Sequence, residues 1–498
     1  MIEIRLKKRL ILEEITMRDR FDTNPELGMK PIEETPVLEK SRDPLQSVVR
    51  ALLAIYNNKE NLHRILSIIE ERVSKNKKNT GRYGLNFWQI FVLAEFRMGL
   101  NLSYDRLHSM VFSDSVLRQI LGAEPITEAG FQNRVIFTRN RILNNVHLLT
   151  DEDLKKINSI IVNFGHKEVF VVKKKEGLNL KTDSFPVQAE VHFPSDHSLL
   201  NDSARKAGDV IEKILKESNI IGWRKFKNWT NTIKNLQRNY AKANTSGGKY
   251  KEKRTQETAD KYLAKAVAFS KKLNQFVEES YSNKTINPIY ITVLKGYISL
   301  LDKHIDLFYR RVKLGEKIPH DEKLFSIFEQ YAEWLSKGKR NVEIGKNTSI
   351  TTDQYGLILD YYIMEKETDS QIVIDTKDRI LACFTVDSWS FDKGYWSKIN
   401  YQAFGMDEVK HLVMPKKGKL NKTEKARENT PEFKKYKRNH SAVESSVNEV
   451  EHSGLHRCRD KGYAAFKRYV GMGVIAHNLK RIGKELRKQD EIKLKKAA

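Results

Sequence analysis

The chain has 498 residues, and its 89 Lys and Arg against 64 Asp and Glu leave a formal net charge of +25. A composition of 40% hydrophobic and 31% charged residues excludes a disordered chain and allows a sizeable core in more than one domain. The surplus of positive charge favours a polyanion as partner, nucleic acid first and an anionic membrane surface second.

Hydropathy and cysteine content exclude further classes. No stretch approaches roughly 18 uncharged apolar residues, so we expect no membrane span. The first residues, MIEIRLKKRLILEE, lack the long apolar segment of a secretory signal. Cys383 and Cys458 are too few for a disulfide framework or a cysteine-rich zinc site. We therefore expect a soluble protein of the cytoplasm that faces nucleic acid.

The N-terminal third is expected to be helical. Residues 1–45 read as a charged leader, in which four prolines prevent a long helix. Residues 46–165 place apolar side chains at helical spacing, for example Val49, Leu52 and Leu53. We predict an all-α domain over 46–165, which is either a scaffold or a domain that binds DNA ends.

The helical spacing of apolar residues ends near residue 168. Alternating apolar and polar residues predict strands over 168–175 and 178–193, with a hairpin near Pro186. From 203 to 340 the pattern is helical again and predicts a helical insertion that packs on itself, with a loop at 245–254. Its apolar seam steps by four and three residues, through Tyr262, Ala266, Phe269, Leu273 and Phe276.

Strand patterns resume after the insertion, at 347–365 and 380–387. Residues 166–202 and 341–480 are therefore expected to form one β-containing core that the helical insertion interrupts. The predicted fold class is α+β, mostly helical, with a mixed sheet and an all-α N-terminal domain.

The C-terminal part is basic. Residues 416–438 carry ten Lys and Arg against three Glu, and residues 441–488 have a helical pattern. The last residues, 481–498, form a basic tail. Such a segment is expected either to bind phosphate groups or to be a solvated charge run.

Three acidic residues are candidates for chemistry. Asp183 lies in the first predicted strand, Asp392 lies just past the strand predicted at 380–387, and Glu444 lies near the start of a helix. Carboxylates without Cys or His partners suit Mg²⁺ or Mn²⁺. Two such ions can activate a hydroxyl and stabilise the leaving oxygen of a phosphodiester.

Each of these residues also has a structural interpretation. Asp183 fits a turn residue at a strand end, and Asp392 fits a turn that precedes Gly394. Ser441 and Glu444 fit a capping box, in which the glutamate would bond to the N-cap amide. Spacing alone leaves these alternatives open.

Four blocks in a fixed order carry a resemblance to a known family. They are DSFPVQAEVHFPSDHSLLND (183–202), VEIGKNTSITTDQYGLILDY (342–361), FDKGYWSKINYQAFGMDEVKHLVMPKKGK (391–419) and HSAVESSVNEVEHSGLHRCRDKGYAAFKRYVGMGVIAHNLKRIG (440–483). Together with a helical head segment, GRYGLNFWQIFVL (81–93), they resemble the DDE transposases of bacterial insertion sequences. The resemblance covers the chain from about residue 180 onward, and four blocks in order are more specific than one motif.

The resemblance implies an RNase H-like core and assigns roles. Asp183 and Asp392 match the catalytic aspartates and Glu444 matches the glutamate, so that these three would bind two Mg²⁺ or Mn²⁺ ions per active site. Asp387 and Glu451 are the nearest rivals for the second and third carboxylates. The implied partner is double-stranded DNA, both the terminal inverted repeats and the target, with a homodimer or larger synaptic complex and a place near the bacterial nucleoid.

The match is not complete. Phe185 stands where the family commonly continues with Thr after the first aspartate block. Tyr436, Arg438 and His440 precede Glu444, but not at the intervals of a related transposase group. The roles of Arg438 and His440 are therefore open.

Basic residues near the three carboxylates are candidates for contact with DNA. They are Lys416, Lys417, Lys419, Arg438, His440, Arg457 and Arg468. A nuclease without strand transfer, or a domesticated transposase that only binds DNA, would carry the same signals. A membrane-surface protein is least favoured, because no basic amphipathic helix with a strong apolar face stands alone.

Overall fold

The structure is a computed structural model of the chain. The residues that it describes are 29–38, 41, 43–74, 84–126, 137–172, 177–217, 223, 225–280, 286–337, 341–404 and 408–497. Most of the predicted charged leader, 1–45, lies outside these residues. The chain divides into two compact units, which are described separately: Met1–Glu190 with Leu335–Ala498, and Val191–Trp334.

The first unit begins with a series of helices. They are η1 (Ile32–Glu34), α2 (Pro44–Asn57), α3 (Lys59–Ser74), α4 (Phe87–Gly99), α5 (Tyr104–Ser113), α6 (Ser115–Ile120), α7 (Arg139–Val146), α8 (Asp151–Phe164) and the π-helical turn η2 (Gly165–Val169). Local signals set their starts. The Asp43 side chain accepts from the Leu45 amide beside Pro44, and Thr150 and Asp153 form a capping box at α8. In the described part of 46–165 all regular elements are helices, as expected.

A seven-stranded mixed sheet follows, so the α+β class is confirmed. Its strands are β1 (Leu178–Ala189), β2 (Glu333–Lys337), β3 (Asn341–Thr352), β4 (Ile358–Ile363), β5 (Val386–Phe391), β6 (Val409–Val413) and β7 (Arg457–Cys458). The order is β2-β3-β1-β5-β6, with β4 paired to β3 and β7 paired to β1. β1 is antiparallel to β3 but parallel to β5, and β5 is parallel to β6.

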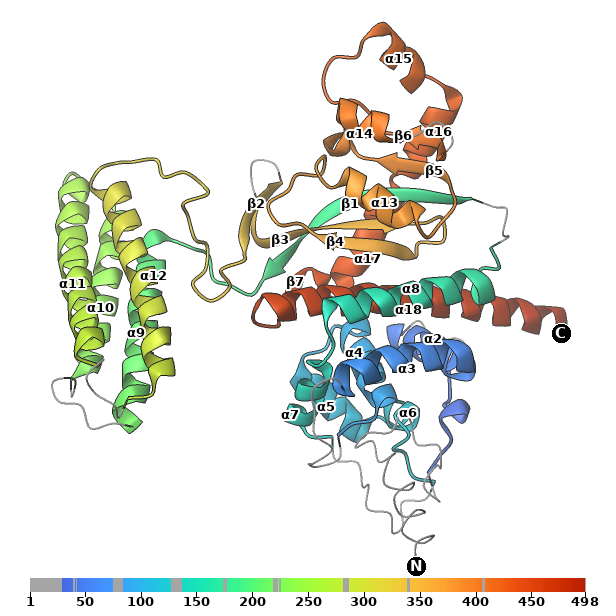
Figure 1. Ribbon diagram of the computed structural model, residues 1–498, viewed down its shortest axis with the longest axis horizontal. Coiled ribbons are helices and arrows are strands. Elements are labelled where there is room, and N and C mark those ends of the chain that lie inside the picture. The colour runs from blue at the N-terminus through green and yellow to red at the C-terminus, as the bar shows by residue number, and fades with distance from the viewer. Residues whose placement is uncertain are drawn as a thin grey trace, which may run out of the picture. The chain divides into compact units, whose positions relative to one another are not determined.

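Further helices surround the sheet. They are α13 (Val373–Leu381), η3 (Lys393–Tyr395), α14 (Lys398–Ala403), α15 (Lys422–Glu428), α16 (Pro431–Asn439), α17 (Ala442–Val450), the π-helical turn η4 (Glu451–Leu455) and α18 (Tyr463–Ala497). Helix α17 packs against β1, whereas α8 and α18 run side by side and both contact β4 (Figure 1). Helix α18 also packs against α2 and α4, so the N-terminal helices and the sheet share it as a common support.

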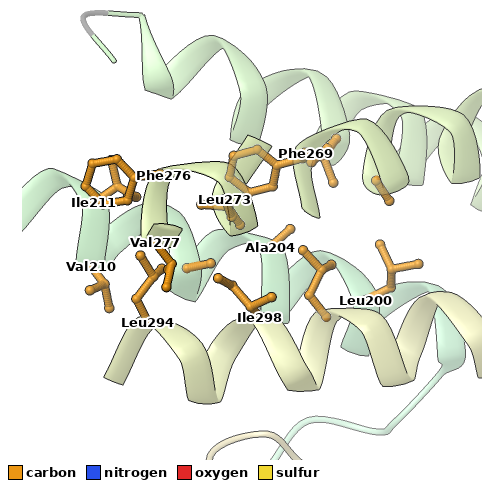
Figure 2. Packing of buried hydrophobic residues seen from close by; sticks show 14 of the residues in the cluster. Leu200, Ala204, Val210, Ile211, Phe269, Leu273, Phe276, Val277, Leu294 and Ile298 are labelled. Atoms are coloured by element: carbon orange, nitrogen blue, oxygen red, sulfur yellow. The ribbon is translucent and has the colours of Figure 1, made fainter. Parts of the chain in front are cut away.

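The second unit is a bundle of four helices. They are α9 (Asp196–Glu217), α10 (Phe226–Thr245), α11 (Lys251–Ser280) and α12 (Pro288–Val312). All five residues of the predicted α11 seam are buried, which confirms that seam. Figure 2 shows side chains of α9, α11 and α12 meeting in one core, with Phe269 and Leu273 facing Ala204 and Ile298. The loop predicted at 245–254 is shorter, because α11 already begins at Lys251.

Three local predictions were wrong. No strand forms at 168–172 within the strand predicted at 168–175, because Gly165–Val169 is the π-helical turn η2 and the described residues 170–172 have no strand structure. No hairpin forms near Pro186, since β1 continues through it to Ala189. The β1–β5 pairing ends at Thr182 and the β1–β7 pairing begins at Gln188, so the proline lies where that edge of β1 has no ladder partner.

The strand predicted at 380–387 is shifted. Ile380 and Leu381 end α13, which buries Val373, Thr376 and Ile380 on one face, and β5 begins only at Val386. A short apolar run does not distinguish the end of a helix from a strand.

No helix among the described residues combines the length and the apolar character that crossing a membrane requires.

Candidate functional site

Asp183 and Asp392 stand at corresponding positions beside the last pair of the ladder between two neighbouring parallel strands. That last pair is Thr182 with Phe391; Asp183 is the next residue of β1, and Asp392 is the first residue after β5. Neighbouring strands lie about 4.8 Å apart, so the register brings the two backbones close together. The ladder ends here because the chain turns into η3 directly after Asp392. Asp183 is half-buried and Asp392 is exposed, as a site open to a large substrate requires.

Two hydrogen bonds of Ser184 fix β1 at the position of Asp183. The Ser184 amide donates to Asp183 Oδ1 at 2.8 Å, and Ser184 Oγ donates to Asp369 Oδ1 at 2.7 Å. Burial raises the pKa of Tyr395 well above its usual value, and the charges of Asp369 and Asp183 add to this rise. Because successive side chains of a strand point to opposite faces, Ser184, and with it Asp369, lies on the face of β1 opposite to the Asp183 side chain. Sequence reasoning missed Asp369, which lies in the connection between β4 and α13 and has no motif around it.

Glu444 approaches from the helix that covers β1. Helix α17 buries Val443, Ser446 and Val450, and Glu444 is exposed one position after Val443. The capping box is absent: Ser441 has helical backbone angles, and its hydroxyl donates to the Arg438 carbonyl at 2.9 Å instead. The turn between α16 and α17 stays nearly helical, so Ser441 cannot adopt the extended conformation of an N-cap.

His440 lies between the second aspartate and the glutamate. Its Nδ1 is 3.0 Å from the Ser390 hydroxyl on β5. Burial lowers the pKa of His440, the carboxylates of Asp392 and Glu444 oppose this shift, and the Lys181 ammonium adds to it. The half-buried imidazole of His440 thus lies within electrostatic range of both Asp392 and Glu444, and its contact with Ser390 brings the start of α17 near the end of β5.

A polar pocket of about 610 Å³ lies on the same face of the sheet. Alternation along a strand places Asn179 and Lys181 on the face of Asp183, and Ser388 and Ser390 on the face of Asp392. These four side chains form the floor of the pocket, and residues of α16 and the start of α17 line its other wall. The pocket therefore shares its face of the sheet with the two aspartates, which follow two residues after Lys181 and Ser390.

The pocket is positively charged. Lys181 is only 8% exposed, and its ammonium donates to the Asp353 carbonyl at 3.5 Å. Burial lowers the pKa of Lys181, while the Asp353 carboxylate opposes this shift. Lys435 and Arg438 of α16 are exposed and line the same pocket. Three cations without a carboxylate in the lining suit an anionic group such as a phosphate.

The donor set fits a hard divalent ion only in part. Asp183 and Asp392 offer adjacent carboxylate oxygens, which Mg²⁺ and Mn²⁺ prefer. Within the described ranges, however, no three or more His, Cys, Asp or Glu side chains are arranged to hold a metal ion. A complete ligand set therefore requires a third carboxylate, that of Glu444, to turn toward the aspartate pair.

The two rival carboxylates lie elsewhere. Asp387 is the second residue of β5, five positions before Asp392, and is 3.4 Å from the ammonium of Lys410. Five residues of strand span about 16 Å, so Asp387 lies far from the level of Asp183. Glu451 opens η4, about two helical turns beyond Glu444.

Some of the residues predicted to contact DNA are exposed and others are not. Lys417, Lys419 and Arg457 are exposed, and Arg457 also donates to the Gln188 side chain at 3.2 Å. Lys416 is half-buried and engaged, because its ammonium donates to both carboxylate oxygens of Glu424 at 2.8 and 2.9 Å.

Arg468 does not reach the surface. It is 7% exposed and donates to the His147 carbonyl at 3.1 Å. This position inside the unit does not favour the predicted contact of Arg468 with DNA. Arg468 instead has a structural role, because its hydrogen bond links α18 to the segment after α7.

Comparison with known proteins adds no assignment: no protein-family model, no curated protein and no solved structure matches the chain.

Proposed function

We propose that the chain is a DDE transposase with an RNase H-like core, which cleaves DNA at the ends of a mobile element and joins the freed 3′-hydroxyl to target DNA. The observation that carries this proposal is the register of β1 and β5, which sets Asp183 beside Asp392. The position of Glu444 on the helix that covers β1 supports it, as does the net charge of +25.

The three carboxylates would bind the catalytic metal ions. Asp183 and Asp392 supply the fixed pair of ligands, and Glu444 completes the site from α17. When bound, Mg²⁺ or Mn²⁺ ions, two per site, supply activation of the attacking oxygen and stabilisation of the leaving oxygen. Asp369 accepts a hydrogen bond from Ser184 on the opposite face of β1 and so supports the strand that carries Asp183.

The basic pocket would hold the DNA strand that reacts. Lys181, Lys435 and Arg438 line it beside the aspartates, and each can bind a backbone phosphate. In the first step, water attacks the phosphorus and the bond to the 3′-oxygen breaks, which leaves a 3′-hydroxyl. In the second step, this hydroxyl attacks a phosphodiester of the target, and the target's own 3′-oxygen leaves.

The partners follow from this chemistry. The substrates are double-stranded terminal repeats and target DNA, so the protein acts in the cytoplasm, on the chromosome. Because two ends must be joined to one target, a homodimer or larger assembly is expected.

A joining assay tests the function. The full chain is incubated with Mg²⁺, a supercoiled plasmid, and a labelled duplex that carries the DNA flanking its own coding sequence. We expect nicked ends and label covalently joined to the plasmid, both absent for Asp183→Asn and Asp392→Asn. Cleavage without joined product would favour a nuclease, and binding without cleavage would favour a DNA-binding protein.

A further inference from the structure

Helix α10 differs from the rest of its bundle in charge. Its twenty residues contain four cations, Lys227, Lys234, Arg238 and Lys242, and no Asp or Glu. The other three helices balance their charges better, with four Lys and Arg against five Asp and Glu in α9, seven against five in α11 and four against two in α12. The positive charge of the insertion is therefore concentrated on one helix.

These cations lie on one exposed face. Lys227, Lys234, Arg238 and Lys242 follow one another by seven, four and four residues, which keeps them on one side of a helix. All four are exposed, and the sixteen residues from Lys227 to Lys242 span about 22 Å. Asn and Thr side chains are exposed between them. The opposite side of α10 enters the core of the bundle through Ile233, Tyr240 and Ala243.

The positive stripe continues around the tip of the α10–α11 hairpin. Residues 246–254 are all exposed and contain Lys249, Lys251, Lys253 and Arg254 against one acid, Glu252. We name these four cations and the four of α10 the basic face. It carries eight positive charges and one negative charge within the unit Val191–Trp334.

Internal ion pairs do not neutralise the basic face. Lys227 is paired with Glu212 at 3.3 Å. Among the residues that the structure describes, Lys234, Arg238 and Lys242 have no ion-pair partner. Their charge is thus available to an external anion.

The side chains around these cations favour DNA over a lipid surface. A membrane-bound helix presents a large apolar face beside its cations, whereas the apolar side of α10 is used in the bundle core. Exposed Asn and Thr side chains between cations match the contacts that proteins make with phosphates and sugars. A stripe of about 22 Å can follow several phosphates of one strand.

We propose that the basic face binds the backbone of duplex DNA, at a surface formed by the helical insertion alone. The proposal rests on the proposed function only in taking DNA as the polyanion. It requires neither the carboxylates nor a divalent ion, so it can be tested apart from cleavage.

The test compares two triple variants of the full chain. Lys234→Gln, Arg238→Gln and Lys242→Gln together remove three charges from the basic face. Lys261→Gln, Lys271→Gln and Lys303→Gln remove three charges from exposed positions of α11 and α12 and serve as the matched control. Binding of a fluorescent random-sequence duplex of about 30 base pairs is measured in EDTA between about 0.05 and 0.2 M salt.

Loss of three phosphate contacts should reduce the slope of log K against log salt by about 2.7 and weaken binding at least tenfold at the lowest salt. The control should keep the slope of the unmodified chain. Equal behaviour of the two variants, each shown to be folded by its thermal transition, would overturn the proposal. Loss of binding to vesicles of anionic lipid, with duplex binding unchanged, would also overturn it. Because no divalent ion is present, a catalytically inactive protein can still give the positive result.

Discussion

Arg97 of α4 donates two hydrogen bonds to the carboxylate of Asp460, at 3.1 and 2.6 Å, and both residues are buried. The guanidinium also lies 4.0 Å from the centre of the Tyr104 ring. This pair ties the N-terminal helices to the segment between β7 and α18. This contact joins residues that are 363 positions apart, in addition to the packing of α18 against α2 and α4.

Removal of one partner of this pair should destabilise the first unit. Arg97→Met leaves the Asp460 carboxylate buried without its counter-charge, which costs about 3–5 kcal/mol of unfolding free energy. Urea unfolding of the variant measures this cost. Lys156→Met, which breaks the exposed pair with Glu152, is the control and should leave the midpoint almost unchanged. A small effect of Arg97→Met would show that the buried pair contributes little.

Two glycines in long helices should respond to alanine in opposite ways. A Cβ on Gly483 of α18 would lie 1.9 Å from the Ser47 carbonyl of α2, so alanine must push these helices apart and cost about 1–3 kcal/mol. A Cβ on Gly296 of α12 meets nothing within 4 Å, so alanine should stabilise the chain by about 0.5–1 kcal/mol. Thermal unfolding of both variants checks the difference in sign.

Glu444→Gln should abolish activity without a loss of stability. Since Ser441 forms no cap and Glu444 is exposed, the amide disturbs no contact that supports the fold. As a lost metal ligand, it should reduce strand joining by more than the roughly 10–100-fold typical of outer-sphere metal partners. Joining assays and unfolding curves are measured on the same sample. An active Glu444→Gln variant would remove Glu444 from the site.

The helical bundle should lose stability in acid because of His304. This residue is 1% exposed, and burial lowers its pKa from 6.5 to about 4. The unfolded chain therefore binds a proton that the folded bundle does not, so stability is complete above pH 6.5 and falls between pH 6.5 and about 4. The loss reaches about 3 kcal/mol.

Hydrogen exchange of peptides from α9 and α12 follows this change locally. His304→Gln removes the titrating group while it retains a side chain that can bond to the Leu300 carbonyl. In this variant unfolding takes up one proton fewer, so the exchange rate should depend less on pH between pH 6.5 and about 4. An unchanged dependence would assign the acid sensitivity to other groups.

Patterns that repeat along the chain could be predicted from the sequence. The α11 seam, the interruption of the sheet by helices and the α+β class all depend on periodicity, which tertiary contacts reinforce. The start of β5 could not be predicted, because the apolar residues from Ile380 serve first the end of α13 and then a turn. The continuation of β1 through Pro186 could not be predicted either. It is possible because one edge of β1 has no ladder partner at the proline, which the sequence does not show.

The candidate site could be predicted only as a set of residues. Resemblance selected Asp183 and Asp392, but their adjacency follows from the register of two strands that are more than 200 positions apart in sequence. The missing cap at Ser441 follows from the nearly helical link between α16 and α17, which the motif does not show. Asp369 supports β1 through a hydrogen bond with Ser184, and the sequence gives no signal of this contact.

Manganese binding, followed by electron paramagnetic resonance of the full chain, tests the central claim most directly. We predict that Asp183→Asn and Asp392→Asn each weaken Mn²⁺ binding strongly, whereas Asp387→Asn, at the far end of β5, binds Mn²⁺ like the unmodified chain. Equal Mn²⁺ affinity in all four proteins would contradict a metal site at Asp183 and Asp392.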